Sequence, residues 1–261
     1  MCLKNCRRRL VASMLFLCIL LWGSCGSMNV VSEAYSVGGV RFTMVEVKGG
    51  SFNMGPTEAQ EQDSHDVDYP VHKVTLSDYY IGQTEVTQAL WMAVMNYNPS
   101  EFVDPQKPVE NVSWFECAQF IEKLNKLTNQ NFRLPTDAEW EYAARGGNKS
   151  KNYKYSGSNV LNEVAWNINN SGGQSHVVAT KKPNELGIYD MSGNVWEWCD
   201  DWFYMFDDKP AINPRGQEPS PQGIKIDRGG GWNRSPRSVT SYRGRDKADL
   251  KDSNLGFRLA K

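Results

Sequence analysis

Apolar and polar residues alternate in several short stretches of the chain, which is the pattern of strands that face a core on one side. In chain order these stretches are residues 40–47 (VRFTMVEV), 71–76 (VHKVTL), 225–228 (KIDR) and 256–259 (GFRL). The alternation in the second stretch predicts that His72 points outward and is not a ligand. After a turn within residues 187–199, Trp196 and Trp198 stand two apart, which predicts a further strand whose indoles face a core.

A second pattern, with apolar residues three or four apart, predicts three helices, at about 87–96, from 113 to about 127, and at 137–145. Ser113 with Glu116, and Thr136 with Glu139, have the spacing of capping boxes. Cys117 lies on the apolar side of the middle helix, which favours packing or a disulfide over a reactive thiol. Helices in the first half, followed by short irregular strands, predict a single α+β domain.

The composition agrees with a loop-rich body whose core contains many aromatic residues. Of 261 residues 40% are hydrophobic, with 22 Gly and nine Trp. The net charge of −1, from 29 Lys and Arg against 30 Asp and Glu, excludes a broad nucleic-acid-binding face. Acidic residues gather in 57–68, which predicts a solvated surface loop, with a cation or partner site as the alternative.

Residues 1–24 have the pattern of a bacterial lipoprotein signal peptide. Basic residues precede the apolar stretch Leu10–Trp22, which is shorter than the roughly 20 residues of a spanning helix. Gly23 and Ser24 then precede Cys25, which is the expected site of lipidation. Plain secretion and an uncleaved anchor are the alternatives. We expect a tether over 25–38, a domain over 39–261, and attachment to the bacterial cell envelope only through the lipid.

Two cysteines follow Cys25, and both are candidates for one disulfide. In an oxidising compartment Cys117 and Cys199 can form that bond, or each can pack as a small apolar residue, and both alternatives are open. The spacing does not suit zinc, because the chain has no Cys-x-x-Cys and only three scattered histidines.

Several strings, taken together and in order, resemble the formylglycine-generating, sulfatase-modifying-factor family. They span about residues 40–260: 49–55 (GGSFNMG), 70–74 (PVHKV), 82–87 (GQTEVT), 111–114 (NVSW), 133–145 (RLPTDAEWEYAAR), 184–198 and the closing GFR. The resemblance implies a C-type-lectin-like fold, loop-rich, with short strands and a few helices.

The resemblance also defines what the chain lacks. Active members of the family oxidise a sulfatase cysteine to formylglycine with copper held by two cysteines. These two positions correspond to Arg234 and Val239, and the serine of the preceding Gly-Gly-Ser segment is Gly231. Cu(I) requires soft thiolate ligands, so no copper and no catalytic residues are expected.

A calcium site of the family matches the turn before the Trp-Glu-Trp string. The resemblance implies that the Asp190 side chain, the Gly193 and Val195 carbonyls and Glu197 hold one structural Ca²⁺. Hard oxygen donors around a turn suit this ion. The alternative is that Asp190 caps the turn and Glu197 pairs with a buried arginine such as Arg258.

The family's substrate cleft corresponds to five residues: Trp232, Asn233, Arg234, Arg237 and Ser238. An exposed indole beside two arginines suits an anionic or peptide ligand. The alternative is that Trp232 packs into the core while the arginines are solvated. Two functions follow for the protein. One is a non-catalytic envelope lipoprotein that binds a protein or peptide, and the other is an oxidase of the family type with atypical ligands.

Overall fold

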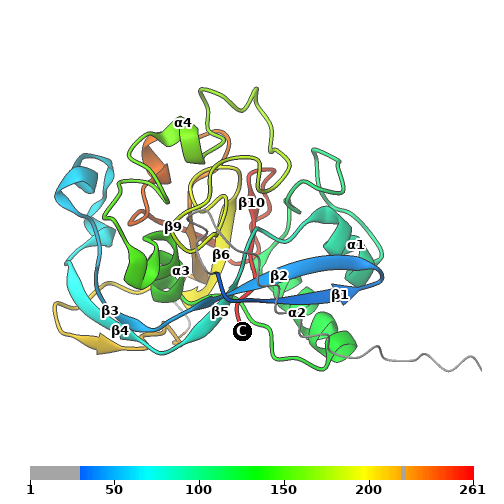
Figure 1. Cartoon of the computed structure of the whole chain (residues 1–261), viewed down its shortest axis with the longest axis horizontal. Coiled ribbons are helices and arrows are strands. Elements are labelled where there is room, and N and C mark those ends of the chain that lie inside the picture. The colour runs from blue at the N-terminus through cyan, green and yellow to red at the C-terminus, as the bar shows by residue number, and fades with distance from the viewer. Residues whose placement is uncertain (1–29, 219–221) are drawn as a thin grey trace, which may run out of the picture.

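A computed structural model describes residues 30–218 and 222–261, which form three small sheets surrounded by helices and long loops (Figure 1). The first sheet is antiparallel, in the order β1-β2-β5, with β1 (Ser32–Val37), β2 (Val40–Val47) and β5 (Tyr79–Gly82). Lys261 closes onto this sheet, because its Nζ lies 3.1 Å from Glu33 Oε2 and its carbonyl accepts the Tyr80 N–H at 3.0 Å.

The predicted tether over 25–38 is wrong for Ser32–Val37, which form β1. A turn at Gly38 and Gly39, both at positive φ, pairs β1 with β2. Tyr35 packs its ring against Phe42 and Phe132 at centroid distances of 5.5 and 5.0 Å. A polar segment thus becomes a strand because Tyr35 and Val37 pack against the apolar core of the domain.

The second sheet has the order β3-β4-β7, with β3 (Gly50–Met54), β4 (His72–Leu76) and β7 (Ala211–Ile212). The strand predicted over 71–76 is confirmed, but its outward His72 is wrong. His72 is buried, with its ring 4.5 Å from that of Phe206 and its Nδ1 3.0 Å from the Pro70 carbonyl oxygen. His72, Val74 and Leu76 therefore share the inner face of β4.

The third sheet carries the Trp-Glu-Trp string on an inner strand. Its order is β10-β6-β8-β9, with β10 (Leu255–Gly256), β6 (Trp196–Trp202), β8 (Ile224–Arg228) and β9 (Arg243–Lys247). The closing strand predicted over 256–259 is thus present only at its start, and Ala260 instead forms single bridges with Ile81 and Arg133.

Three predicted helices are confirmed close to their expected bounds, namely α1 (Gln88–Met95), α2 (Trp114–Thr128) and α3 (Asp137–Ala144). Ser113 and Thr136 cap α2 and α3 through full capping boxes. The shorter helical turns are η1 (Glu58–Asp63), η2 (Asp66–Asp68), η3 (Gly147–Lys149), α4 (Leu161–Val164) and η4 (Pro236–Ser238). The α+β class and the loop-rich architecture are as predicted.

Strand β6 separates two apolar clusters. Trp196 and Trp198 belong to the first cluster, with Trp91 and Phe120, whereas Cys199 belongs to the second. The prediction that both indoles face a core is confirmed, but the opposite side of the strand is buried as well. A strand with both faces covered ties the two clusters into one body.

None of the helices in 30–218 and 222–261 has the length and apolar character needed to cross a membrane. The expected signal peptide and the lipidation site at Cys25 lie outside these ranges.

Candidate binding surface and cation site

A tight turn precedes β6 and sets the geometry of the predicted calcium site. Asp190, Gly193 and Asn194 all have positive φ, at 59°, 80° and 59°. At Gly193 a Cβ atom would lie 2.3 Å from the Trp166 carbonyl oxygen, so only glycine fits there. The conformation of the turn therefore depends on these backbone angles and on the glycine at position 193.

Glu197 leaves this turn pointing into the protein, where it is fully buried. Arg258 contacts both carboxylate oxygens, with Nε 2.5 Å from Oε2 and Nη2 2.7 Å from Oε1. Trp140 donates its indole N–H to Oε2 at 2.7 Å. The predicted alternative, a glutamate paired with a buried Arg258, is thus present in the structure.

Glu85 is a third acidic residue of this region, and sequence reasoning missed it. Its carboxylate is buried and accepts the side-chain amide of Asn194 at 2.9 Å and the N–H of Val195 at 3.3 Å. Burial, with the charges of Asp190 and Glu197, raises the pKa of Glu85 well above its ordinary value. The available signal was an acid inside the string GQTEVT, just before a helix cap.

Asp190 is buried and keeps one carboxylate oxygen free to bind a cation. Its Oδ2 accepts the Ala179 N–H at 2.7 Å, whereas its buried Oδ1 has no hydrogen-bond partner. Burial raises the pKa of Asp190 to about 6. Three buried carboxyl groups thus surround one guanidinium, that of Arg258, and leave an excess of acidic groups.

This arrangement fits a hard divalent cation. The free Oδ1 of Asp190 is an oxygen donor, and a cation would offset the excess acidity. Within the described residues, no three His, Cys, Asp or Glu side chains converge as metal ligands. A cation would therefore depend on backbone carbonyls as well, which is the donor set that the family resemblance implies at Gly193 and Val195.

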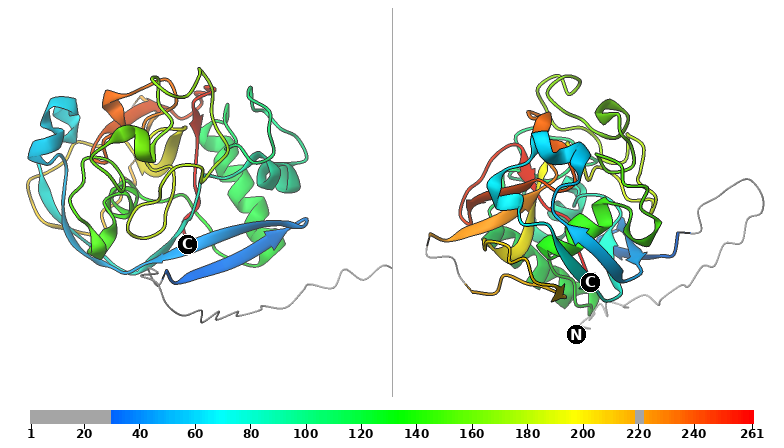
Figure 2. Two further views of the ribbon diagram at one scale, coloured as in Figure 1. Left: turned by 45° about the horizontal axis from the view of Figure 1, so that its top comes forward. Right: turned by 90° about the vertical axis from the view of Figure 1, so that its left-hand side faces the viewer.

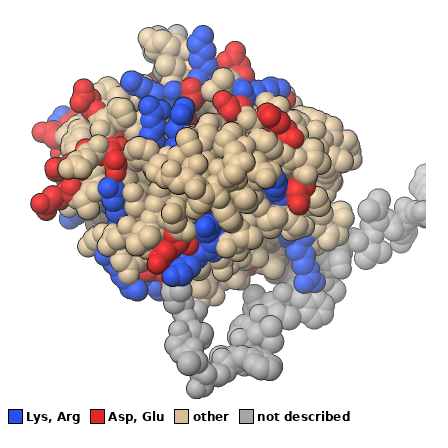
Figure 3. Space-filling view, turned by 90° about the horizontal axis from the view of Figure 1, so that it is seen from above, with Lys and Arg blue, Asp and Glu red and all other residues tan. Residues whose placement is uncertain are grey.

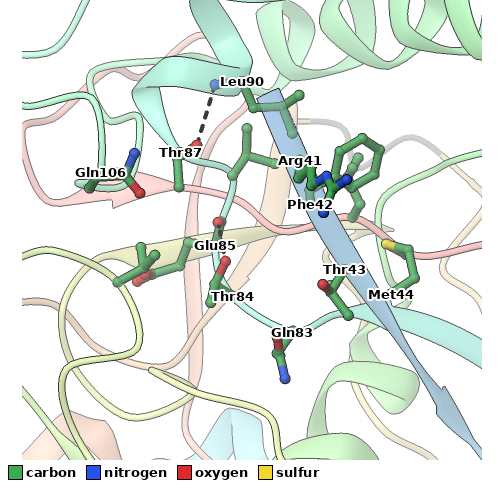
Figure 4. Close-up of a pocket in the computed structure, with 14 residues that line it drawn as sticks. Arg41, Phe42, Thr43, Met44, Gln83, Thr84, Glu85, Thr87, Leu90 and Gln106 are labelled. Atoms are coloured by element: carbon green, nitrogen blue, oxygen red, sulfur yellow. Dashed lines mark hydrogen bonds between the residues drawn. The ribbon is translucent and has the colours of Figure 1, made fainter. Parts of the chain in front are cut away.

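A small pocket of about 170 Å³ opens beside Glu85 (Figure 4). Thr43, Thr84 and Thr87 line it together with Met44 and Leu90. Ligand pockets for drug-sized molecules are about 300–1,000 Å³, so this one suits water or a very small molecule.

The predicted ligand-binding residues separate into exposed and buried groups. Arg234 and Arg237 are exposed, and Asn233 is half-buried with a buried Oδ1 that lacks a partner. Ser238 is fully buried, so it does not face a ligand, contrary to expectation. Trp232 is half-buried: its indole donates to the Ser253 carbonyl at 3.1 Å and packs edge-on against Phe102 at 5.6 Å.

The two positions where the family holds copper lie in opposite environments. Arg234 is exposed, whereas Val239 is fully buried in the first apolar cluster. Neither side chain offers a sulfur ligand for Cu(I).

The cysteines of the described residues, Cys117 and Cys199, are both free and buried. They belong to different apolar clusters, and burial raises the pKa of each thiol. Of the two alternatives, the structure therefore shows packed thiols and no disulfide.

The fold, the turn before β6 and the segment after β8 define a domain of the formylglycine-generating type. Residues 40–261 match the sulfatase-modifying factor enzyme 1-like domain, and the chain belongs to this family. Chaperone protein LppX of Paenibacillus barcinonensis is 36% identical, over 84% of this chain and 89% of that protein.

Two further matches are a solved structure and an enzyme of the family. The structure of Treponema denticola variable protein 1 matches with a TM-score of 0.79 and 34% identity, over 88% of this chain and 98% of that one. The formylglycine-generating enzyme of Streptomyces coelicolor is 33% identical, but the match covers 60% of this chain and 53% of that enzyme.

Proposed function

We propose that this protein is an exported, lipid-anchored domain that binds another protein without catalysing a reaction. The observation that carries the proposal is the pair Arg234 and Val239, which stand where the family holds copper. An oxidase of this type without thiolate ligands lacks its reaction centre. The chain nevertheless keeps the fold of the family, and the surface of that fold is available for binding.

Two observations support the proposed location in the cell envelope and the proposal that the partner is a protein. Small residues precede Cys25 after an apolar stretch, as in lipoprotein signal peptides. The relative that is 36% identical is named a chaperone, which describes a protein that acts on other proteins. The partner that fits both is a protein or peptide of the cell envelope, and the membrane contact is the lipid alone.

The competing proposal is an oxidase with atypical ligands, which the intact family framework favours. A direct assay separates the two. We expect no aldehyde when the purified protein is incubated with copper, oxygen and a sulfatase-type Cys-x-Pro-x-Arg peptide. The formylglycine-generating enzyme of Streptomyces coelicolor is the positive control. Aldehyde formed at a rate above a copper-only blank would refute the non-catalytic function.

We also propose that the turn before β6 holds one structural Ca²⁺ through Asp190, the carbonyls of Gly193 and Val195, and Glu197. The unpaired Oδ1 of Asp190 and the excess of buried acidic groups support this ligand set. The ion would fix the turn and would take no part in a reaction. Because Arg258 and Trp140 already contact Glu197, binding would require Glu197 to share its oxygens with them.

A further inference from the structure

A second hollow, of about 370 Å³, lies between the loop after η1 and the segment that contains η4. Ser64 and His65 line one side, and Arg234 and Arg237 line the other. In the views of Figures 1 and 2, η1 and η4 lie side by side, at the end of the molecule opposite to β1 and β2. Two of the five residues that correspond to the family cleft thus meet the acidic loop that the sequence predicted mainly as solvated surface.

The loop side of the hollow is held by buried polar anchors. Gln60 is fully buried, and its side-chain amide donates to the Lys154 carbonyl and to Thr240 Oγ1, each at 2.8 Å. Asp68, also fully buried, accepts the His65 N–H at 2.8 Å and the Arg243 N–H at 3.0 Å. This wall is therefore fixed before a ligand arrives, which lowers the entropic cost of binding.

Tyr242 connects the two sides. The ring of His65 meets it edge-on at 4.9 Å, and the guanidinium of Arg237 lies 5.5 Å from its centroid. Tyr242 itself is buried, so it positions one residue from each wall against the same ring.

The positive charge of the hollow has no partner in the part of the chain that the structure describes. There, neither Arg234 nor Arg237 forms an ion pair, whereas the acid of the lining, Asp63, is paired with Lys154 at 2.7 Å. Asp227 and Asp246 interact electrostatically with Arg237. Burial raises the pKa of both carboxyl groups, however, and thereby disfavours the negative charge that would neutralise the arginine.

An uncharged area adjoins these arginines. The Arg234 carbonyl accepts the N–H of Ile168, whose side chain is 60% exposed, and Trp232 packs on Phe102 close by. The view from above shows basic side chains beside a broad area without charge (Figure 3). A ligand that covers both surfaces needs acidic groups and apolar groups along one extended chain.

We propose that this hollow binds adjacent acidic side chains of a peptide segment in the partner protein, an inference that rests on the proposed binding function. The two guanidinium groups would each donate paired hydrogen bonds to a carboxylate, and an apolar side chain of the same segment would lie on Ile168 and Trp232. The acidic motif would then select the partner, while the apolar contact would add affinity.

The test uses fluorescence anisotropy with labelled decapeptides that carry two adjacent aspartates beside a leucine, and matched peptides with asparagine in place of aspartate. We expect the aspartate peptide to bind at least about tenfold more tightly, because only it can form charge-assisted hydrogen bonds. The double variant Arg234→Ala, Arg237→Ala should lose at least about tenfold in affinity for it. Arg245→Ala removes an exposed arginine of β9 outside the hollow and should bind as the wild type does.

Equal affinity for both peptides, binding of neither, or full affinity in the double variant would overturn the inference. A pull-down from the native envelope separates it from the function on which it rests. If the double variant still captures the partner of the wild type, the acidic-segment site fails while the binding function stands. Aldehyde formation in the copper assay would instead refute the non-catalytic function, independently of the affinity of the double variant for the peptides. Both substituted side chains are exposed, so an unchanged melting temperature serves as the folding control.

Discussion

Glu197 and Arg258 form a buried ion pair that links strand β6 to the segment after β10. Two contacts of 2.5 and 2.7 Å join them, and Arg258 also donates to the carbonyls of Gly82 and Tyr189, each at 3.0 Å. One guanidinium therefore joins the segment of Arg258 to two others that are distant in sequence, at Gly82 and at 189–197.

Removal of this guanidinium should be strongly destabilising. In Arg258→Met, three buried carboxyl groups lose the cation beside them, and breaking a buried pair costs about 3–5 kcal/mol. Urea unfolding measures the loss. Lys126→Met, which breaks an exposed pair with Glu122, is the control and should cost less than about 1 kcal/mol. Equal effects of the two variants would contradict this account.

Calcium should stabilise the domain through Asp190. Chelation by EGTA should lower the melting temperature, and excess Ca²⁺ should restore it, by roughly 5–10 °C at a hundredfold excess over the dissociation constant. Asp190→Ala should abolish the shift, because it removes the unpaired Oδ1. Asp208→Ala, at an exposed acid, should keep it. If EGTA leaves the melting temperature unchanged, or if Asp190→Ala shows the full shift, no calcium ion is bound at this turn.

Glu110 should make stability depend on pH. It is fully buried, Oε1 accepts the Phe102 N–H, Oε2 has no partner, and burial raises its pKa from 4.5 to about 7. The folded state keeps this proton longer than the unfolded state, so the stabilisation is complete below about pH 4.5 and is lost as the pH rises through 7.

Glu110→Gln cannot ionise and should escape that loss. We expect it to match the wild type near pH 5 and to be more stable at pH 8, by about 1–3 kcal/mol. Urea unfolding at both pH values measures the difference. Glu122→Gln, on the exposed side of α2, should leave the wild-type profile unchanged. Parallel profiles for wild type and Glu110→Gln would show that Glu110 does not titrate in this range.

Lipidation is tested directly. Radiolabelled palmitate fed to expressing cells should enter the wild-type protein and should not enter Cys25→Ala. Cys117→Ala, which removes a buried thiol of the core, should label as the wild type does. Equal labelling of wild type and Cys25→Ala would end the claim of a lipid anchor.

Local signals in the sequence predicted the helices well. The capping boxes at Ser113 and Thr136 involve residues three apart, so their geometry is contained in a few neighbouring positions. The family strings, read together, predicted the loop-rich fold of the formylglycine-generating family. These are properties that short segments carry by themselves.

The errors concern contacts between distant segments. Strand β1 depends on Tyr35 meeting Phe132, and the burial of His72 depends on Phe206. Glu85 reaches Asn194, 109 residues later, so no local pattern marks it as part of the turn. Arg237 was expected in the cleft, but its neighbour His65 was not, because only the fold brings η1 to η4.

The contact between Lys261 and Glu33 brings the first strand and the last residue together at the lower edge of the domain in the view of Figure 1. The hollow with Arg234 and Arg237 lies away from this edge, between η1 and η4, which are at the upper left in the same view. With the proposed lipid anchor ahead of β1, the arginines would lie on another side of the domain from the membrane, and a partner would dock without displacing the anchor. A reporter fused after Lys261 would sit next to β1 and leave the hollow with Arg234 and Arg237 free.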